Sequence, residues 1–159
     1  MTHLQIGDTA PDFDLPTDGG GTAKRGDYQG QSLLLYFYPK DDTPGCTTES
    51  CEFRDALGDF QSLNTAIIGI SKCSVKKHDK FKTKHALNFP LISDENGTMC
   101  EDYGVWVEKN MYGKKFMGIQ RATFLINQTG TITHIWPKVK VKGHVEEVRN
   151  VIATLEKAA

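Results

Sequence analysis

The length, composition and charge of the chain exclude several classes of protein. Its 159 residues are enough for one domain, spanning residues 1–159, to bury a core without disulfide staples. Because 19 basic residues stand against 20 acidic ones, the formal net charge is −1, and we expect neither nucleic acid nor a membrane surface as a partner.

The same features predict the compartment. No segment approaches the roughly 18 apolar residues that span a bilayer, and the first residues lack the basic and apolar regions of a signal peptide. We therefore expect a cytoplasmic protein. In that reducing compartment the 4 cysteines should be free thiols or transiently oxidised ones rather than structural bridges.

Strand and helix patterns alternate along the first half of the chain. Glycines at 19–21 indicate the turn of a small N-terminal hairpin. Residues 32–39 form an apolar and aromatic run that ends at proline, which is typical of a strand covered on both faces. A helix is predicted next, with Thr43 as its N-cap and Pro44 at its first position. Residues 65–71 form a second buried strand, so these three elements make a βαβ unit with parallel strands.

The second half of the chain continues the alternation of strands and helices. The predicted elements are a helix at 75–85, a short strand at 89–93, a short helix at 98–103, two antiparallel strands at 121–127 and 131–137, and an amphipathic helix at 144–158. The sequence therefore predicts an α/β fold with a central mixed sheet flanked by helices.

Two cysteines near the start of the first long helix have a spacing that fits neither common template. Cys46 and Cys51 have four residues between them. They are thus five positions apart, whereas metal-binding cysteines usually sit roughly two to four positions apart and a thioredoxin-type redox pair has two residues between its sulfurs. Cys46 should lie at the carboxyl edge of the sheet and in the first turn of a helix, where unpaired N–H groups favour an anion such as a thiolate.

The residues around these cysteines resemble a known family. The segments PKDDTPGCTTESCEFRD, at 39–55, and MYGKKFMGIQRATFLI, at 111–126, closely resemble the peroxiredoxins, and within them the bacterioferritin comigratory protein or peroxiredoxin Q branch. The signature Pro-x-x-x-Thr-x-x-Cys is met by Pro39, Thr43 and Cys46. Arg121 matches the arginine that this family carries just before a late strand. The resemblance implies a thioredoxin-like fold.

The resemblance also implies an activity. Members of the family reduce hydrogen peroxide and organic hydroperoxides without a metal, flavin or other cofactor, and are recycled by a dithiol reductant such as thioredoxin. By this resemblance Cys46 is the peroxidatic cysteine and Cys51 the resolving one, so the chain would be an atypical two-cysteine peroxiredoxin. The branch further implies a monomer.

Peroxide chemistry gives each matching residue a role. The site must hold a thiolate, orient the peroxide and stabilise the departing oxygen. We expect Thr43, Arg121 and the backbone N–H groups at the helix start to supply donors, and Pro39 to keep water from the sulfur. Glu49, which also matches the branch, is expected to orient Arg121 through a charge-assisted hydrogen bond.

Two other functions remain open from the residues themselves. A thiol-disulfide oxidoreductase acting on proteins fits the fold, although the spacing of Cys46 and Cys51 opposes it. A binding module or holdase that uses its thiols as a redox switch is the other alternative. Consumption of peroxide by the reduced protein, with loss of two thiols and no protein substrate, would separate the three functions.

The remaining cysteines and the histidines fall outside the shared motif. Cys100 lies in a predicted short helix, and packing is its expected role. Cys73 follows the second buried strand and so lies on the same sheet edge as Cys46, which leaves disulfide exchange open to it. The 5 histidines have no metal-ligand spacing, so we expect no metal centre. The stretch KVKVKG, at 138–143, is interpreted as a solvated edge or loop.

Overall fold

A central sheet of five strands organises the computed structural model, which describes the backbone of residues 1–158 and the side chains of residues 1–157. The strand order is β5-β4-β3-β8-β9. The strands are β3 (Ser32–Phe37), β4 (Thr65–Ser71), β5 (Leu91–Ser93), β8 (Ala122–Ile126) and β9 (Ile132–Trp136). Strand β3 is parallel to β4 and antiparallel to β8, so the sheet is mixed as predicted.

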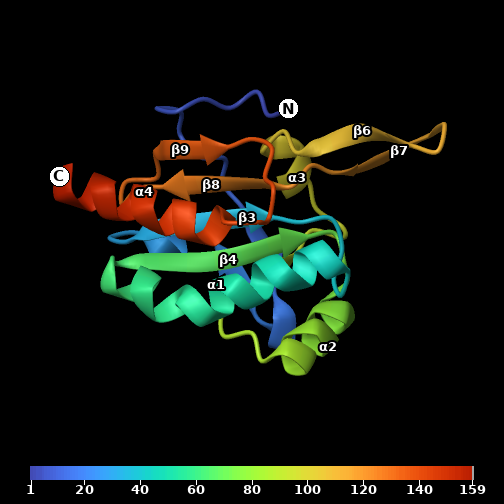
Figure 1. Cartoon of the computed structure of the whole chain (residues 1–159), viewed down its shortest axis with the longest axis horizontal. Helices are drawn as coiled ribbons and strands as arrows, with labels where there is room; N and C mark the ends of the chain where they lie inside the picture. Colours follow the sequence, from blue (N-terminus) through green and yellow to red (C-terminus); the bar gives the residue numbers. More distant parts are fainter. Residues whose placement is uncertain (159) are drawn as a thin grey trace.

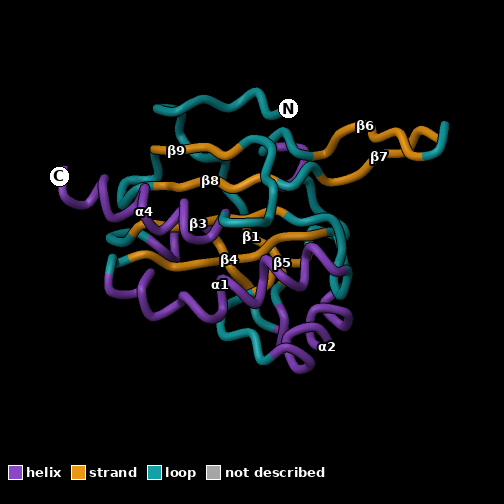
Figure 2. Tube along the Cα trace, in the orientation of Figure 1, coloured by secondary structure: helices purple, strands orange, loops and turns teal. Residues whose placement is uncertain are grey.

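Helices and loops cover both faces of the sheet (Figures 1 and 2). The helices are α1 (Pro44–Ser62), α2 (Val75–His85), α3 (Met99–Asp102) and α4 (His144–Ala158). Strand β3 alternates between two cores because successive side chains of a strand point to opposite faces. Leu34 and Tyr36 pack with Phe53 of α1, whereas Leu33 and Leu35 pack in the core that includes α3.

The predicted elements of the βαβ unit are present. Helix α1 crosses from β3 to β4, which pair in parallel from Ser32 with Thr65 to Phe37 with Ile70. The predicted helices at 75–85 and 144–158 coincide with α2 and α4. At the N-terminus, β1 (Asp14–Pro16) and β2 (Thr22–Lys24) form the small antiparallel hairpin expected around the glycines. Between them lies a short helix, η1 (Asp18–Gly20), and after β2 lies η2 (Arg25–Tyr28).

One hairpin was not predicted. Strands β6 (Trp106–Met111) and β7 (Lys114–Ile119) pair with each other and extend from the body at one end (Figure 1). Their turn places Tyr112 and Gly113 at positive φ, the arrangement that a two-residue hairpin turn requires. Tyrosine is an unusual first residue for such a turn, and the exposed strands carry more lysine than β-branched side chains. Because the turn and the strands both lack the usual residue types, the sequence pattern did not predict this hairpin.

Among the described residues, no helix combines the length and the apolar character needed to cross a membrane.

Candidate active site

The first turn of α1 places Cys46 at the carboxyl edge of the sheet. Thr43 is the N-cap residue and Pro44 opens the helix, as predicted. The Thr43 carbonyl accepts the first helical bond, from the Thr47 amide at 2.8 Å. The Thr43 side chain, however, makes no capping bond, which corrects the predicted cap. Its hydroxyl donates instead to the Lys40 carbonyl at 2.9 Å and so closes the loop that leads into the helix.

Arg121 brings a positive charge to the Cys46 sulfur. One guanidinium N–H donates to Cys46 Sγ at 3.3 Å, and another donates to Glu49 Oε1 at 2.7 Å. A guanidinium in this position stabilises an anion on the sulfur and fixes its own orientation through the carboxylate. Gly45 permits the approach, because a Cβ there would lie 3.2 Å from Arg121 Nη2.

Glu49 belongs to α1, and its side chain is fully buried. Its Oε1 pairs with Arg121, whereas Oε2 has no hydrogen-bond partner among the described residues. Burial raises the pKa of Glu49 to about 7, and the charge of Arg121 opposes that rise. A carboxylate is held in this low-polarity place only because the guanidinium pairs with it, so the two side chains form one unit.

A buried polar chain anchors the active-site loop, residues 38–43, which joins β3 to α1. The Tyr38 hydroxyl donates to Asp41 Oδ1 at 2.6 Å, and Asp41 Oδ2 contacts His78 Nδ1 at 2.6 Å. His78 Nε2 in turn contacts the Ile92 carbonyl at 2.9 Å. Helix α2 and strand β5 therefore hold the loop that precedes Cys46.

The four cysteines are free thiols in different settings. Cys46 is 1% exposed, and Cys51 is partly exposed within the same continuous helix. Cys73 lies beneath the active-site loop, where its sulfur accepts the Asp41 amide at 3.4 Å. Cys100 is fully buried in α3, where its backbone amide donates to Asp94 Oδ2 at 2.8 Å. Burial raises the pKa of the Cys100 thiol, which agrees with a packing role.

The structure thus brings together some of the predicted site residues. Cys46, Glu49 and Arg121 touch one another, and Thr43 lies three residues before Cys46 at the helix start. Pro39 is partly buried in the loop after β3, and no hydrogen bond or ion pair connects it to the other site residues. Their roles in catalysis stay predictions.

Sequence reasoning missed three residues near the site. Asp41 and His78 form the buried anchor although they are 37 residues apart, so no local pattern reveals them. Lys109 lies on β6 of the unpredicted hairpin, where it is partly buried. Burial and the charge of Arg121 lower the pKa of Lys109, whereas Cys46 opposes that change.

No cluster of metal-ligand side chains occurs within the described part of the chain. A thioredoxin-like sheet, a cysteine in the first turn of the crossover helix and an arginine at its sulfur together define a thiol-dependent oxidoreductase. This class fits peroxide chemistry, because the guanidinium can donate hydrogen bonds both to a thiolate and to a peroxide oxygen beside that thiolate.

Comparisons with known proteins narrow the class. The model of the AhpC/TSA family matches residues 6–135. The putative peroxiredoxin bcp of Coxiella burnetii is 53% identical over 145 residues, which are 91% of this chain and 96% of that protein. Peroxiredoxin Bcp of Bacillus subtilis is 51% identical over 144 residues, 91% of this chain and 92% of that one.

A solved structure of a related protein also matches the chain over nearly its whole length. The bacterioferritin comigratory protein of Xanthomonas campestris, studied for its alkyl peroxide reduction activity, matches with a TM-score of 0.89 at 39% identity. The match covers 98% of this chain and 99% of that one. The chain belongs to the AhpC/TSA family, among the peroxiredoxins of the bacterioferritin comigratory protein or Q type. It is a thiol peroxidase, and the predicted thioredoxin-like fold is confirmed.

Proposed function

We propose that this peroxidase reduces hydrogen peroxide and organic hydroperoxides in the cytoplasm as a monomeric, atypical two-cysteine enzyme. The Cys46 thiolate attacks one peroxide oxygen, the O–O bond breaks, and the other oxygen leaves as hydroxide or alkoxide, which takes a proton from water. Cys46 is left as a sulfenic acid. The alkyl peroxide activity of the Xanthomonas campestris relative supports the organic hydroperoxides as substrates.

The contact between Arg121 and Cys46 carries this proposal. The guanidinium lies 3.3 Å from the sulfur and presents further N–H groups beside it. A peroxide oxygen that approaches the sulfur would meet those donors as negative charge develops on the leaving oxygen. Glu49 holds the guanidinium in place from below, at 2.7 Å.

Cys51 completes the reaction in the proposed cycle. Its thiolate attacks the Cys46 sulfenic sulfur, hydroxide leaves, and a Cys46–Cys51 disulfide forms before further oxidation of Cys46. A dithiol reductant such as thioredoxin then restores both thiols.

The stoichiometry of the first turnover tests the function. We expect the reduced protein to consume one equivalent of hydrogen peroxide and to lose two titratable thiols without any added protein substrate. Peptide mapping of the product should find Cys46 joined to Cys51. A protein that consumes no peroxide until a protein disulfide is added would instead be a thiol-disulfide oxidoreductase.

The helix must open for the disulfide to form. On a regular helix, residues five apart have Cα atoms separated by about 8.7 Å, from about 7.5 Å of rise and about 140° of rotation. A disulfide requires at most about 7 Å, and the two Cβ vectors also diverge. Because α1 is continuous through Cys46 and Cys51 while both are free, the oxidised segment cannot keep this conformation.

We expect the first turns of α1, up to about Phe53, to be helical in the reduced protein and locally unwound in the oxidised one. Amide hydrogen exchange on the two forms would show faster exchange in this segment after oxidation, with α4 unchanged as an internal control. Equal protection of the segment in both forms, with the Cys46–Cys51 bond verified by mass spectrometry, would contradict the prediction.

A further inference from the structure

A hollow beside the active-site loop is lined by lysines, most of which have no acidic partner among the described residues. It lies between that loop and α2 and has a volume of about 310 Å³. It is lined by four lysines, Lys40, Lys77, Lys80 and Lys84, together with Asp41, Asp42 and Phe81. Lys77, Lys80 and Lys84 are spaced three and four residues apart, so they share one face of α2.

Both carboxylates of the hollow are already paired. Asp41 is buried, and its carboxylate oxygens contact the Tyr38 hydroxyl and His78 Nδ1. Asp42 pairs with Lys84 at 2.9 Å and with His85 at 3.2 Å. These contacts neutralise one of the four lysines and leave the other three without an internal counter-charge.

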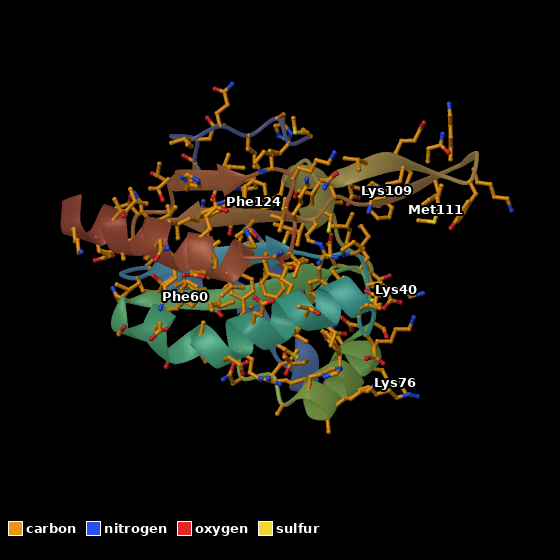
Figure 3. The ribbon with its side chains drawn as sticks, in the orientation of Figure 1. Lys40, Phe60, Lys76, Lys109, Met111 and Phe124 are labelled. Carbon is orange, nitrogen blue, oxygen red and sulfur yellow. The ribbon has the colours of Figure 1, made fainter. Side chains whose placement is uncertain are left out.

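The three remaining lysines are Lys40, Lys77 and Lys80. Each is exposed, and none has an acidic side chain within 4.0 Å in the described part of the chain. Figure 3 shows Lys40, Lys76 and Lys109 at the same end of the molecule, with Lys40 and Lys76 directed outwards. The hollow, with its three exposed lysines, therefore forms a locally positive end in a chain whose formal net charge is −1.

This positive end adjoins the segment that carries both redox cysteines. Arg54, three residues after Cys51, donates to the His85 carbonyl at the end of α2 at 2.7 Å. Asp42, four residues before Cys46, is bound to the same end of α2. Helix α2 is thus tied to the chain on both sides of the two cysteines, so the helix that carries Lys77 and Lys80 flanks the segment in which the disulfide would form.

Hydrogen peroxide is small and neutral, so it gains nothing from this charge. A protein reductant differs, because it must cover the surface around the disulfide, and redox encounters bury little area and depend on charge for their rate. We propose that Lys40, Lys77 and Lys80 form the docking surface for an acidic dithiol protein that reduces the Cys46–Cys51 disulfide. This inference rests on the proposed function and adds the charge and the place of its partner.

The reduction itself balances with the partner dithiol alone. A partner thiolate attacks one sulfur of the disulfide, and the other sulfur leaves as a thiolate. The second partner thiol, deprotonated, attacks the mixed disulfide and releases the remaining sulfur of this chain. The partner ends as a disulfide, and two electrons have passed to Cys46 and Cys51.

Charge reversal on α2 tests the surface. The variant Lys77→Glu/Lys80→Glu is compared with Lys24→Glu/Lys157→Glu, which changes the net charge equally but places the new charges on β2 and near the end of α4. Three rates are measured for each protein: oxidation of the reduced form by hydrogen peroxide, and reduction of the oxidised form by dithiothreitol and by thioredoxin. Each rate is taken at low and at high ionic strength.

We expect Lys77→Glu/Lys80→Glu to slow reduction by thioredoxin at least about 10-fold at low ionic strength, and the difference should shrink in high salt. Its peroxide and dithiothreitol rates should equal those of the unmodified protein, and the control variant should keep all three rates. Failure of the unmodified protein to react with peroxide would contradict the proposed function instead.

Three results would overturn the docking surface. The first is an unchanged thioredoxin rate in the α2 variant. The second is an equal loss in the control variant, which would show a net-charge effect without a site. The third is an unmodified protein that thioredoxin reduces no faster than dithiothreitol does. A fourth rate, oxidation by a carboxylate-bearing organic hydroperoxide, covers the remaining case. If the α2 variant slows this rate and leaves the thioredoxin rate unchanged, the lysines serve an anionic substrate and the partner is rejected.

Discussion

Cys46→Ser is expected to abolish peroxide turnover, lowering the rate by more than roughly 10⁴-fold, while the fold persists. The serine hydroxyl replaces one sulfur in the first turn of α1 and is a far weaker nucleophile at neutral pH than a thiolate. Because Cys46 contributes only one of many side chains to its core cluster, the free energy of unfolding should change little. Peroxide consumption followed directly, with near-ultraviolet circular dichroism to report the packing, would check both parts.

Cys51→Ser is the matched control for this experiment. It removes a sulfur from the same helix but leaves the reacting sulfur and its contact with Arg121 in place. One equivalent of peroxide should still be consumed, and mass spectrometry should find an oxidised Cys46 without the intramolecular disulfide. More than a trace of turnover in Cys46→Ser would place the nucleophile elsewhere, with Cys73 beneath the active-site loop the first residue to test.

Helix α1 shows what local sequence is able to predict. A crossover helix is favoured by Thr43 before Pro44 and by the apolar strands that precede and follow the segment in the chain. The structure begins α1 at Pro44. The position of Cys46 follows from that start. The capping bond did not follow, because the Thr43 hydroxyl has a competing acceptor in the Lys40 carbonyl and local pattern does not rank the two.

Other parts of the site depend on contacts that no local pattern contains. Arg121 meets Cys46 across 75 residues of chain, and only the resemblance to the family predicted that meeting. The pair of Asp41 and His78 had no such guide, and a lone histidine in a lysine-rich helix indicated nothing. Lys109 had no such guide either. Only Ile119 is buried in the two strands of its hairpin, so no buried face enforces a two-residue period there.

Arg121→Lys is expected to slow the reaction with peroxide by about 10²-fold or more, as removal of a donor at a developing oxyanion does in other enzymes. Lysine keeps the positive charge but replaces a planar fork of donors with a single ammonium. The native guanidinium contacts Cys46 Sγ and Glu49 Oε1 at the same time, and an ammonium on a shorter side chain cannot hold both partners and still face the peroxide.

Glu49→Gln separates the charge of this pair from its geometry. The amide keeps the shape of the side chain and an oxygen that accepts from Arg121, so the guanidinium remains beside the sulfur although its anionic partner is lost. We expect a smaller loss of rate in Glu49→Gln than in Arg121→Lys, measured as the second-order rate of oxidation of the reduced protein. Thermal unfolding of both variants would report any loss of folded protein. If Arg121→Lys reacts at the native rate while folded, Arg121 serves the structure of the helix start, and the leaving oxygen must be stabilised by the backbone N–H groups there.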